Sequence, residues 1–145
     1  MNRRSVASEA TPGLVYASDT ETVITPGTDK VGTVFAVSVE SGKKAWTHDE
    51  RAAVTGLLAT GGDLIFGGDV GGGFRALDAE TGAVLWETSL GAQVTGHPVT
   101  YAVGGKQYVA VSTGRSNMTN ALAQLTPDVS PAESKNKLYV FALGE

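Results

Sequence analysis

The strongest constraint on the fold is an internal repeat with an offset of 40 residues. Residues 32–46 (GTVFAVSVESGKKAW) align without a gap with residues 72–86 (GGFRALDAETGAVLW), and 5 of the 15 positions are identical. Trp46 and Trp86, the only two tryptophans of the chain, fall at the same position of the two copies. Such a coincidence is improbable by chance, so the chain is expected to be built from repeated supersecondary units.

Each copy of the repeat has the pattern of a β-hairpin. Apolar residues recur with a period of two, at Val34 and Ala36 in the first copy and at Phe74 and Ala76 in the second. This period is typical of strands with one buried face. The turn segments 39–42 and 79–82 end in Gly42 and Gly82, at a position that favours positive φ. Glycine accounts for 19 of 145 residues, about twice the usual share, which suits many short strands joined by tight turns.

A period near 40 residues with four short strands per unit is typical of a β-propeller blade. The sequence therefore predicts an all-β fold, with residues 1–145 forming one partial propeller of about three blades. The expected units are residues 12–48, 54–88 and 97–143, with a first strand near residues 14–18. An insertion over residues 113–137 interrupts the third unit, and residues 121–125 are expected to form one helical turn. Trp46 and Trp86 are expected to pack between neighbouring sheets.

Composition excludes several classes of function. Eleven Lys and Arg against 15 Asp and Glu give a net charge of −4, which argues against a nucleic-acid partner. The absence of cysteine excludes a disulfide framework, a thiolate metal site and a cysteine nucleophile. No apolar run approaches the roughly 18 residues of a membrane span. The basic start of the chain is not followed by an apolar segment, so a signal peptide is not expected.

Single polar residues give no pattern of a catalytic or metal site. His48 and His97 have no nucleophile motif around them, so His48 is interpreted as a residue of a polar loop and His97 as a loop residue before the strand at Pro98. The aspartates of the second repeat lack the spacing of an oxygen-ligand loop, and Asp78 is expected to accept backbone hydrogen bonds in its turn. Arg75 is interpreted as a solvated charge on a strand. No catalytic residue and no metal ligand are predicted.

Several segments, in order, resemble the quinoprotein alcohol dehydrogenases. Residues 76–86 (ALDAETGAVLW) resemble their tryptophan-docking motif A-x-D-x-x-T-G-x-x-x-W. Residues 56–68 (GLLATGGDLIFGG) resemble their G-x-L-A-T-x-G-x-L-[VI]-F-x-G stretch, and residues 98–111 (PVTYAVGGKQYVAV) resemble a further conserved stretch of that family. Residues 137–143 (KLYVFAL) match the closing strand of the family. The resemblance covers about residues 30–143.

The resemblance implies a fold and an activity. Members of this family form an eight-bladed periplasmic propeller around pyrroloquinoline quinone (PQQ) and Ca²⁺, or a lanthanide in some members. They oxidise primary alcohols to aldehydes and pass electrons to a cytochrome c. This chain resembles the carboxy-terminal blades, and the metal ligands and the catalytic base of the family lie upstream of the matched region.

Two contacts to the quinone fall inside the matched region of the family. One is an aromatic residue just before the G-x-L-A-T stretch, where this chain has Val54 and Thr55. The other is a Gly-Trp pair, where this chain has roughly Asn117 and Met118. Because both aromatic residues are replaced, the resemblance leaves Thr55, Gly56 and Asn117 as the candidate cofactor-binding residues.

Two functions remain open at this stage. The chain is expected to be a propeller segment of a PQQ-dependent alcohol dehydrogenase that is inactive alone. Its partners would then be the remaining blades, with self-association as another way to cover its open faces. The alternative is a non-catalytic PQQ-like repeat scaffold or binding module.

Overall fold

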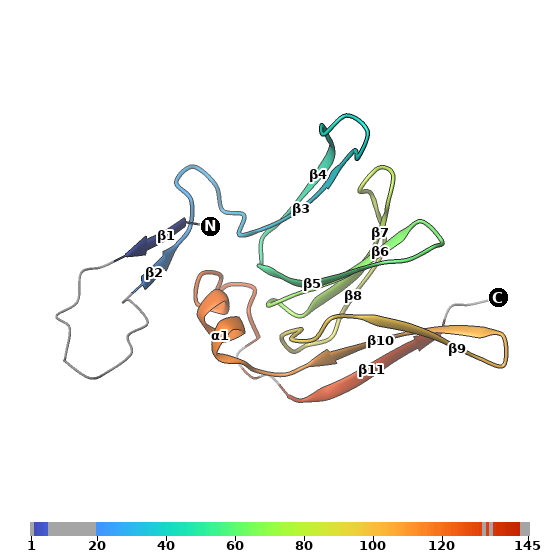
Figure 1. Cartoon of the computed structure of the whole chain (residues 1–145). Helices are drawn as coiled ribbons and strands as arrows, with labels where there is room; N and C mark the ends of the chain where they lie inside the picture. The colour runs from blue at the N-terminus through green and yellow to red at the C-terminus, as the bar shows by residue number, and fades with distance from the viewer. Residues whose placement is uncertain (1, 6–19, 132, 134, 143–145) are drawn as a thin grey trace, which may run out of the picture.

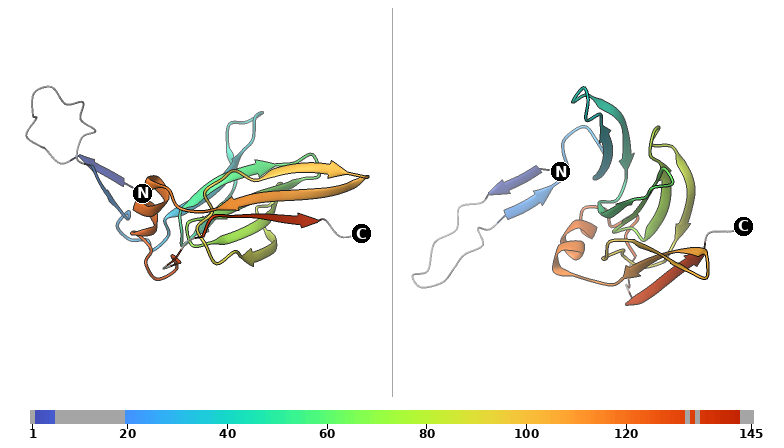
Figure 2. Two further views of the ribbon diagram at one scale, coloured as in Figure 1. Left: turned by 90° about the horizontal axis from the view of Figure 1, so that it is seen from below. Right: turned by 45° about the vertical axis from the view of Figure 1, so that its right-hand side comes forward.

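A computed structural model describes residues 2–5, 20–131, 133 and 135–142. The described residues form eleven strands, arranged in four antiparallel sheets, and one short helix. Three of the sheets follow one another as the layers of an open fan (Figure 1), and Figure 2 shows the same arrangement from two further sides. The structure therefore confirms a mostly β architecture made of small antiparallel sheets.

The central sheet has four strands in the order β5-β6-β7-β8. Their bounds are β5 Val54–Ala59, β6 Leu64–Asp69, β7 Gly73–Asp78 and β8 Val84–Ser89. Each strand pairs with the next through a short connection, as expected for a meander of sequential antiparallel strands. Both inner strands carry mostly buried residues, because this sheet has a neighbouring sheet on each face.

The first sheet of the fan contains β3 (Gly32–Val37) and β4 (Lys44–Glu50). In this hairpin Trp46 pairs with Ala36, and a register shift follows at Val37. Trp86 pairs with Ala76 in the β7–β8 hairpin, and the same shift follows there. The two copies of the sequence repeat thus form the same hairpin twice.

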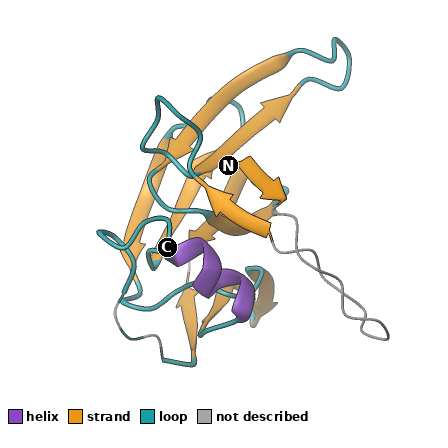
Figure 3. Cartoon of the chain, turned by 90° about the vertical axis from the view of Figure 1, so that its left-hand side faces the viewer, coloured by secondary structure: helices purple, strands orange, loops and turns teal. Residues whose placement is uncertain are grey.

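The third sheet has three strands in the order β11-β10-β9. They are β9 Val99–Val103, β10 Lys106–Thr113 and β11 Lys137–Ala142, and the turn between β9 and β10 uses Gly104 and Gly105 at positive φ. Helix α1 (Asn117–Ala123) lies in the connection between β10 and β11, at one end of the fan (Figure 3). The helical turn predicted at residues 121–125 is therefore longer and starts earlier. Its start is fixed by a capping box at Ser116 and Thr119, which sequence periodicity does not detect.

A further hairpin, which the sequence did not predict, lies outside the fan. It consists of β1 (Asn2–Ser5) and β2 (Thr20–Val23), and it projects away from the three other sheets in the views of Figures 1 and 2. The strand expected at residues 14–18 lies outside the described residues. No helix within the described part of the chain is long and apolar enough to cross a membrane.

The main core lies between the central sheet and the third sheet. The central sheet contributes Phe66 and Phe74, and the third sheet contributes Val109 and Val111, all of them buried. A second, smaller cluster joins the helix to the segment before β5 through Ala123, Ala52 and Ala53. This cluster positions α1 next to the first residues of β5.

Candidate functional site

Thr55 and Gly56 lie near the start of β5, at a bulge in its pairing with β6. The hydroxyl of half-buried Thr55 donates a hydrogen bond to the carbonyl oxygen of Gly68 at 3.1 Å. Gly56 is buried, and a Cβ atom at this position would lie 2.8 Å from Nδ1 of His97. The imidazole of His97 therefore covers Gly56 from the side of the third sheet, and only a glycine fits beneath it.

Asn117 is the first residue of α1, and its side chain is exposed. The side chain of the preceding residue, Ser116, accepts a hydrogen bond from the backbone N–H of Thr119. In return, the hydroxyl oxygen of Thr119 accepts a hydrogen bond from the backbone N–H of Ser116. This capping box satisfies backbone donors that a helix start leaves open, so it fixes the place of Asn117.

Of the three candidate cofactor residues, two are adjacent on one strand and the third lies on the helix. Thr55 and Gly56 are adjacent on β5, and packing of Leu122 and Ala123 against Ala52 and Ala53 holds the helix near that strand. Within the described residues, no hydrogen bond joins Asn117 to Thr55 or Gly56.

These residues do not by themselves fit a planar, tricarboxylate quinone with its metal. The Thr55 hydroxyl already donates to a backbone carbonyl, and Gly56 lies beneath an imidazole. Asn117 offers one amide. A hard cation needs several oxygen ligands, and no group of three His, Asp or Glu side chains suited to a metal occurs in the described part of the chain. The described residues could form at most an edge of such a site.

A charged cluster that the sequence did not predict lies between the first and the central sheets. Arg75 of β7 is 8% exposed and forms ion pairs with three carboxylates. Its Nη1 lies 2.8 Å from Asp69 and 3.0 Å from Glu50, and its Nη2 lies 3.2 Å from Glu87. His48 of β4 lies 2.6 Å from the same Glu50 oxygen. Arg75 thus joins β4 of one sheet to three strands of the next.

The interpretation of Arg75 as a solvated charge was wrong for a physical reason. A strand with one solvent-facing side exposes every second residue, but β7 has a neighbouring sheet on each face. Burial disfavours the charged guanidinium. The hydrogen bond and the charge of Asp69, together with Glu50 and Glu87, outweigh that cost and raise the pKa of Arg75 above its ordinary value. The interpretation of His48 as a loop residue was also wrong, because His48 lies within β4.

Trp46 forms the contact between these same two sheets that the repeat predicts. Its indole N–H donates to the carbonyl oxygen of Ala79 at 3.0 Å, in the turn between β7 and β8. A Cβ atom on Gly82 would lie 2.5 Å from the indole ring, so the ring lies directly on this glycine. The prediction that Trp46 packs between neighbouring sheets is confirmed.

Trp86 is less well covered than expected. Its ring makes edge-to-face contacts with two phenylalanines. The distance between ring centroids is 5.2 Å to Phe141 of the third sheet and 6.0 Å to Phe74 of its own sheet. It therefore lies between two sheets, as predicted, but it remains 40% exposed.

The β7–β8 turn is held by a single carboxylate, as predicted. Oδ1 of Asp78 accepts hydrogen bonds from the backbone N–H groups of Glu80 and Thr81 and from the hydroxyl of Thr81. These bonds from Thr81 and Glu80 stabilise the charged form, so the pKa of Asp78 lies below its ordinary value. The turn presents Gly82 at a φ of +74° to the indole of Trp46.

Comparison with known protein families gives one match that covers more than half of the chain. Residues 29–109 match the family described as PQQ glucose/ethanol/alcohol dehydrogenase, β-propeller domain. The matched range begins before β3 and ends within β10, so it includes both copies of the repeat and the whole central sheet.

Individual relatives agree with this match. The chain is 36% identical over 111 residues to the quinoprotein alcohol dehydrogenase PedE of Pseudomonas putida, which covers 73% of this chain. It is 40% identical over 85 residues, 58% of this chain, to methanol dehydrogenase [cytochrome c] subunit 1 of Methylobacterium organophilum. Among solved structures, a europium-containing methanol dehydrogenase superimposes with a TM-score of 0.78 at 28% identity, over 97% of this chain.

The similarity covers only a small part of each relative. The matched region spans 18% of PedE and 14% of the methanol dehydrogenase subunit, and the superposition covers 29% of the europium-containing chain. The shared part is therefore a fraction of a longer propeller, and the activity of the longer proteins does not transfer automatically to it.

Proposed function

We propose that this chain forms one side of a β-propeller around the cofactor. The reason is that the chain belongs to the β-propeller family of PQQ-dependent glucose, ethanol and alcohol dehydrogenases. The chain is a segment of the PQQ alcohol dehydrogenase propeller. The observation that carries the proposal is the match over residues 29–109, which includes the complete four-stranded sheet β5–β8.

In the complete propeller, we expect PQQ to oxidise a primary alcohol to an aldehyde, with Ca²⁺ or a lanthanide as the metal. The relatives include enzymes whose names state europium and cytochrome c, which supports a lanthanide-tolerant site and a cytochrome c acceptor for the assembled protein. Periplasmic localisation is proposed from the same family. The metal ligands and the base would come from other blades, since no suitable cluster lies in the described residues of this chain.

Within that assembly, Thr55, Gly56 and Asn117 are proposed to line the edge of the cofactor funnel. One structural observation supports this. The capping box at Ser116 fixes the start of α1, where the side chain of Asn117 is exposed. The contribution of these residues would be hydrogen bonds, while aromatic stacking on the quinone would have to come from elsewhere.

A chimera tests the proposed role. The aligned segment of PedE is replaced by the corresponding residues of this chain, and PQQ-dependent oxidation of a primary alcohol is measured. We expect the chimera to oxidise alcohol, with PQQ bound more weakly than in the parent because the aromatic residue before Thr55 is replaced. A matched chimera with Val54→Trp should recover PQQ affinity.

One result of the chimera experiment would contradict the proposed role. If both chimeras fold, as judged by circular dichroism and gel filtration, and neither oxidises alcohol at saturating PQQ and metal, the chain does not form a functional part of this propeller.

A second candidate is a non-catalytic scaffold or binding module with the same repeats. The observation that favours it is the donor set, because the candidate cofactor residues do not by themselves fit the quinone and its metal. A scaffold would rely on the contacts between sheets that Trp46 and Arg75 make, and it would leave the chimera inactive.

A further inference from the structure

His48 lies in the contact between the first and the central sheets, and its side chain is only 23% exposed. Its Nε2 lies 2.6 Å from Oε1 of Glu50, whose side chain is 15% exposed. Protein atoms therefore cover most of both groups. Histidine side chains change charge between about pH 5 and 8, so this pair can respond to pH in that range.

The Glu50 oxygen that faces His48 also binds the next sheet. Nη1 of Arg75, on β7, lies 3.0 Å from the same Oε1. Glu50 therefore connects the imidazole of β4 with the guanidinium of β7. Because one oxygen atom takes part in both interactions, the charge of His48 acts directly on the ion pair that joins the two sheets.

The charges around His48 differ in number. Arg75 is permanently charged, and it forms ion pairs with three carboxylates, those of Glu50, Asp69 and Glu87. One guanidinium thus faces three carboxylates, so the cluster has an excess of negative charge. The like charge of Arg75 opposes a proton on His48, whereas the carboxylates favour it. A proton on His48 supplies a second cation next to Glu50.

The other neighbours of this pair add no further free charge. The side chains that line the space beside His48 and Glu50 from β3, β5 and β7 are otherwise apolar: Val34, Val54, Leu57 and Leu77. Arg51, which follows β4, pairs with Asp128 at 2.6 Å. Charged groups in such surroundings interact more strongly than they do in water. The balance of charge at His48 is therefore set by the Arg75 cluster.

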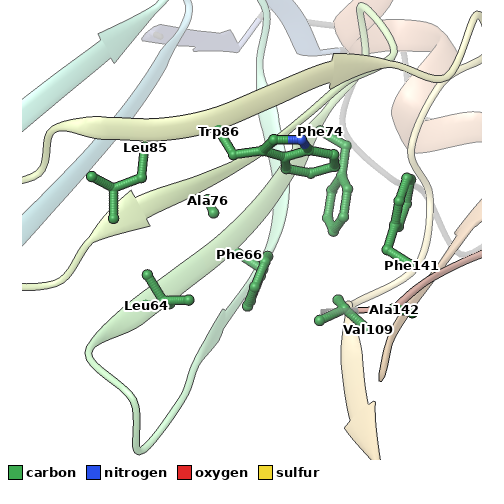
Figure 4. Close-up of a pocket in the computed structure, with 9 residues that line it drawn as sticks. All are labelled: Leu64, Phe66, Phe74, Ala76, Leu85, Trp86, Val109, Phe141 and Ala142. Atoms are coloured by element: carbon green, nitrogen blue, oxygen red, sulfur yellow. The ribbon is translucent and has the colours of Figure 1, made fainter. Parts of the chain in front are cut away.

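The contact between the central and the third sheets is apolar instead. It contains a cavity of about 420 Å³ (Figure 4). In Figure 4 the rings of Trp86, Phe74 and Phe141 approach one another at one side of this space, with Leu64 and Leu85 at the other. None of the described side chains that line the cavity changes charge with pH. A change in the charge of His48 therefore acts on one contact of the fan and not on the other.

We propose that protonation of His48 strengthens the contact between the first and the central sheets, so that this contact depends on pH. The neutral imidazole can donate an ordinary hydrogen bond to Glu50. The charged imidazole donates a charge-assisted hydrogen bond and offsets part of the excess negative charge. It has these partners only in the folded chain. The added stability is therefore present at mildly acidic pH and is lost as the pH rises and the proton leaves.

Urea denaturation of the full chain tests the proposal at about pH 5.5 and about pH 8. The parent is compared with His48→Gln, whose amide can still donate a hydrogen bond to Glu50 but carries no charge. We expect the folding equilibrium constant of the parent to exceed that of the variant at about pH 5.5. This ratio should be at least about fivefold larger than the ratio at about pH 8.

Hydrogen exchange of the two indole N–H groups locates the effect. The indole N–H of Trp46 donates to Ala79 between the same two sheets, whereas Trp86 lies in the apolar contact. Both resonances are followed in the ¹⁵N-labelled full chain and assigned by the loss of one in Trp86→Phe. Parent and His48→Gln are compared at the same pH, so the intrinsic effect of pH on exchange cancels. At about pH 5.5 the variant should exchange at Trp46 at least about fivefold faster, with less than about a twofold change at Trp86.

The matched control is His97→Gln, because His97 is exposed and forms no ion pair within the described residues. Its folding constant relative to the parent should be the same at both pH values. In a chain with Glu50→Gln, His48→Gln should also have the same effect at both. The proposal is overturned if His48→Gln acts equally at the two pH values, acts more strongly at the higher one, or keeps its pH dependence without Glu50. The experiments contain no PQQ, so their result is independent of the proposed function.

Discussion

Gly82 and Gly42 hold the same position in two copies of one turn, yet their surroundings differ. Both have positive φ, +74° and +66°. The indole of Trp46 lies on Gly82, whereas nothing lies within 4 Å of a Cβ atom on Gly42. The pair therefore separates the cost of backbone strain from the cost of losing a contact between sheets.

We expect Gly42→Ala to lower the free energy of unfolding by about 1 kcal/mol, the usual cost of a left-handed backbone for a residue with a side chain. Gly82→Ala should cost at least about 3 kcal/mol, because the added methyl group also displaces the ring of Trp46. Urea denaturation of both variants measures the difference. Equal losses in the two variants would show that the packing of the Trp46 ring does not depend on Gly82.

Asp78 links the same turn to pH. Hydrogen bonds from Thr81 hold the pKa of Asp78 below its ordinary value, so the carboxylate stabilises the fold fully above its unfolded-state pKa of about 3.9. This contribution is lost as the pH falls through the lower folded-state pKa. An NMR titration of the Asp78 carboxyl should show a higher midpoint in Thr81→Val than in the parent chain. An unchanged midpoint would contradict the assigned cause.

Several single residues were predictable because their roles depend on local pattern. The repeat placed Trp46 against a neighbouring sheet, and turn chemistry gave the roles of Asp78 and Gly82. Arg75 was not predictable in this way. Its burial depends on a second sheet packing over β7, and its main partner on the other sheet, Glu50, is 25 residues away in the sequence.

At the scale of elements, Arg75 is the charged counterpart of Trp46 in joining the first and central sheets. Arg75→Gln should lower the free energy of unfolding by about 3–5 kcal/mol, because it leaves the buried carboxylate of Asp69 without a counter-charge and removes the ion pair with half-buried Glu50. Arg51→Gln is the control. Its bridge to Asp128 is more exposed, so the expected cost is below about 1 kcal/mol. Comparable losses in thermal denaturation would refute the distinction.

The elements themselves were predictable to different degrees. Hairpins β3–β4 and β7–β8 followed from the repeat, because alternation and turn glycines are local features. The predicted position of helix α1 was wrong by several residues, because the start of the helix depends on reciprocal hydrogen bonds between Ser116 and Thr119 rather than on apolar periodicity. The β1–β2 hairpin was missed because its short, polar strands carry no alternation.

At the scale of the whole molecule, three sheets fan out in sequence order and bury aromatic and aliphatic side chains between them. This architecture follows from the repeat, because each unit needs a neighbour to cover its face. The candidate cofactor edge was predictable only as positions within a family pattern. Where Asn117 lies relative to Thr55 and Gly56 depends on packing of α1 against Ala52 and Ala53, which no local pattern reveals.

The central claim is that PQQ chemistry belongs to the assembled propeller, to which this chain contributes structure and an edge of the cofactor funnel. Equilibrium dialysis of PQQ against the pure chain, with saturating Ca²⁺ or a lanthanide, tests it most directly when followed by a dye-linked assay of alcohol oxidation. PedE assayed in parallel is the positive control. We expect no saturable binding at micromolar PQQ and no turnover by the chain alone. Micromolar binding together with turnover would contradict it.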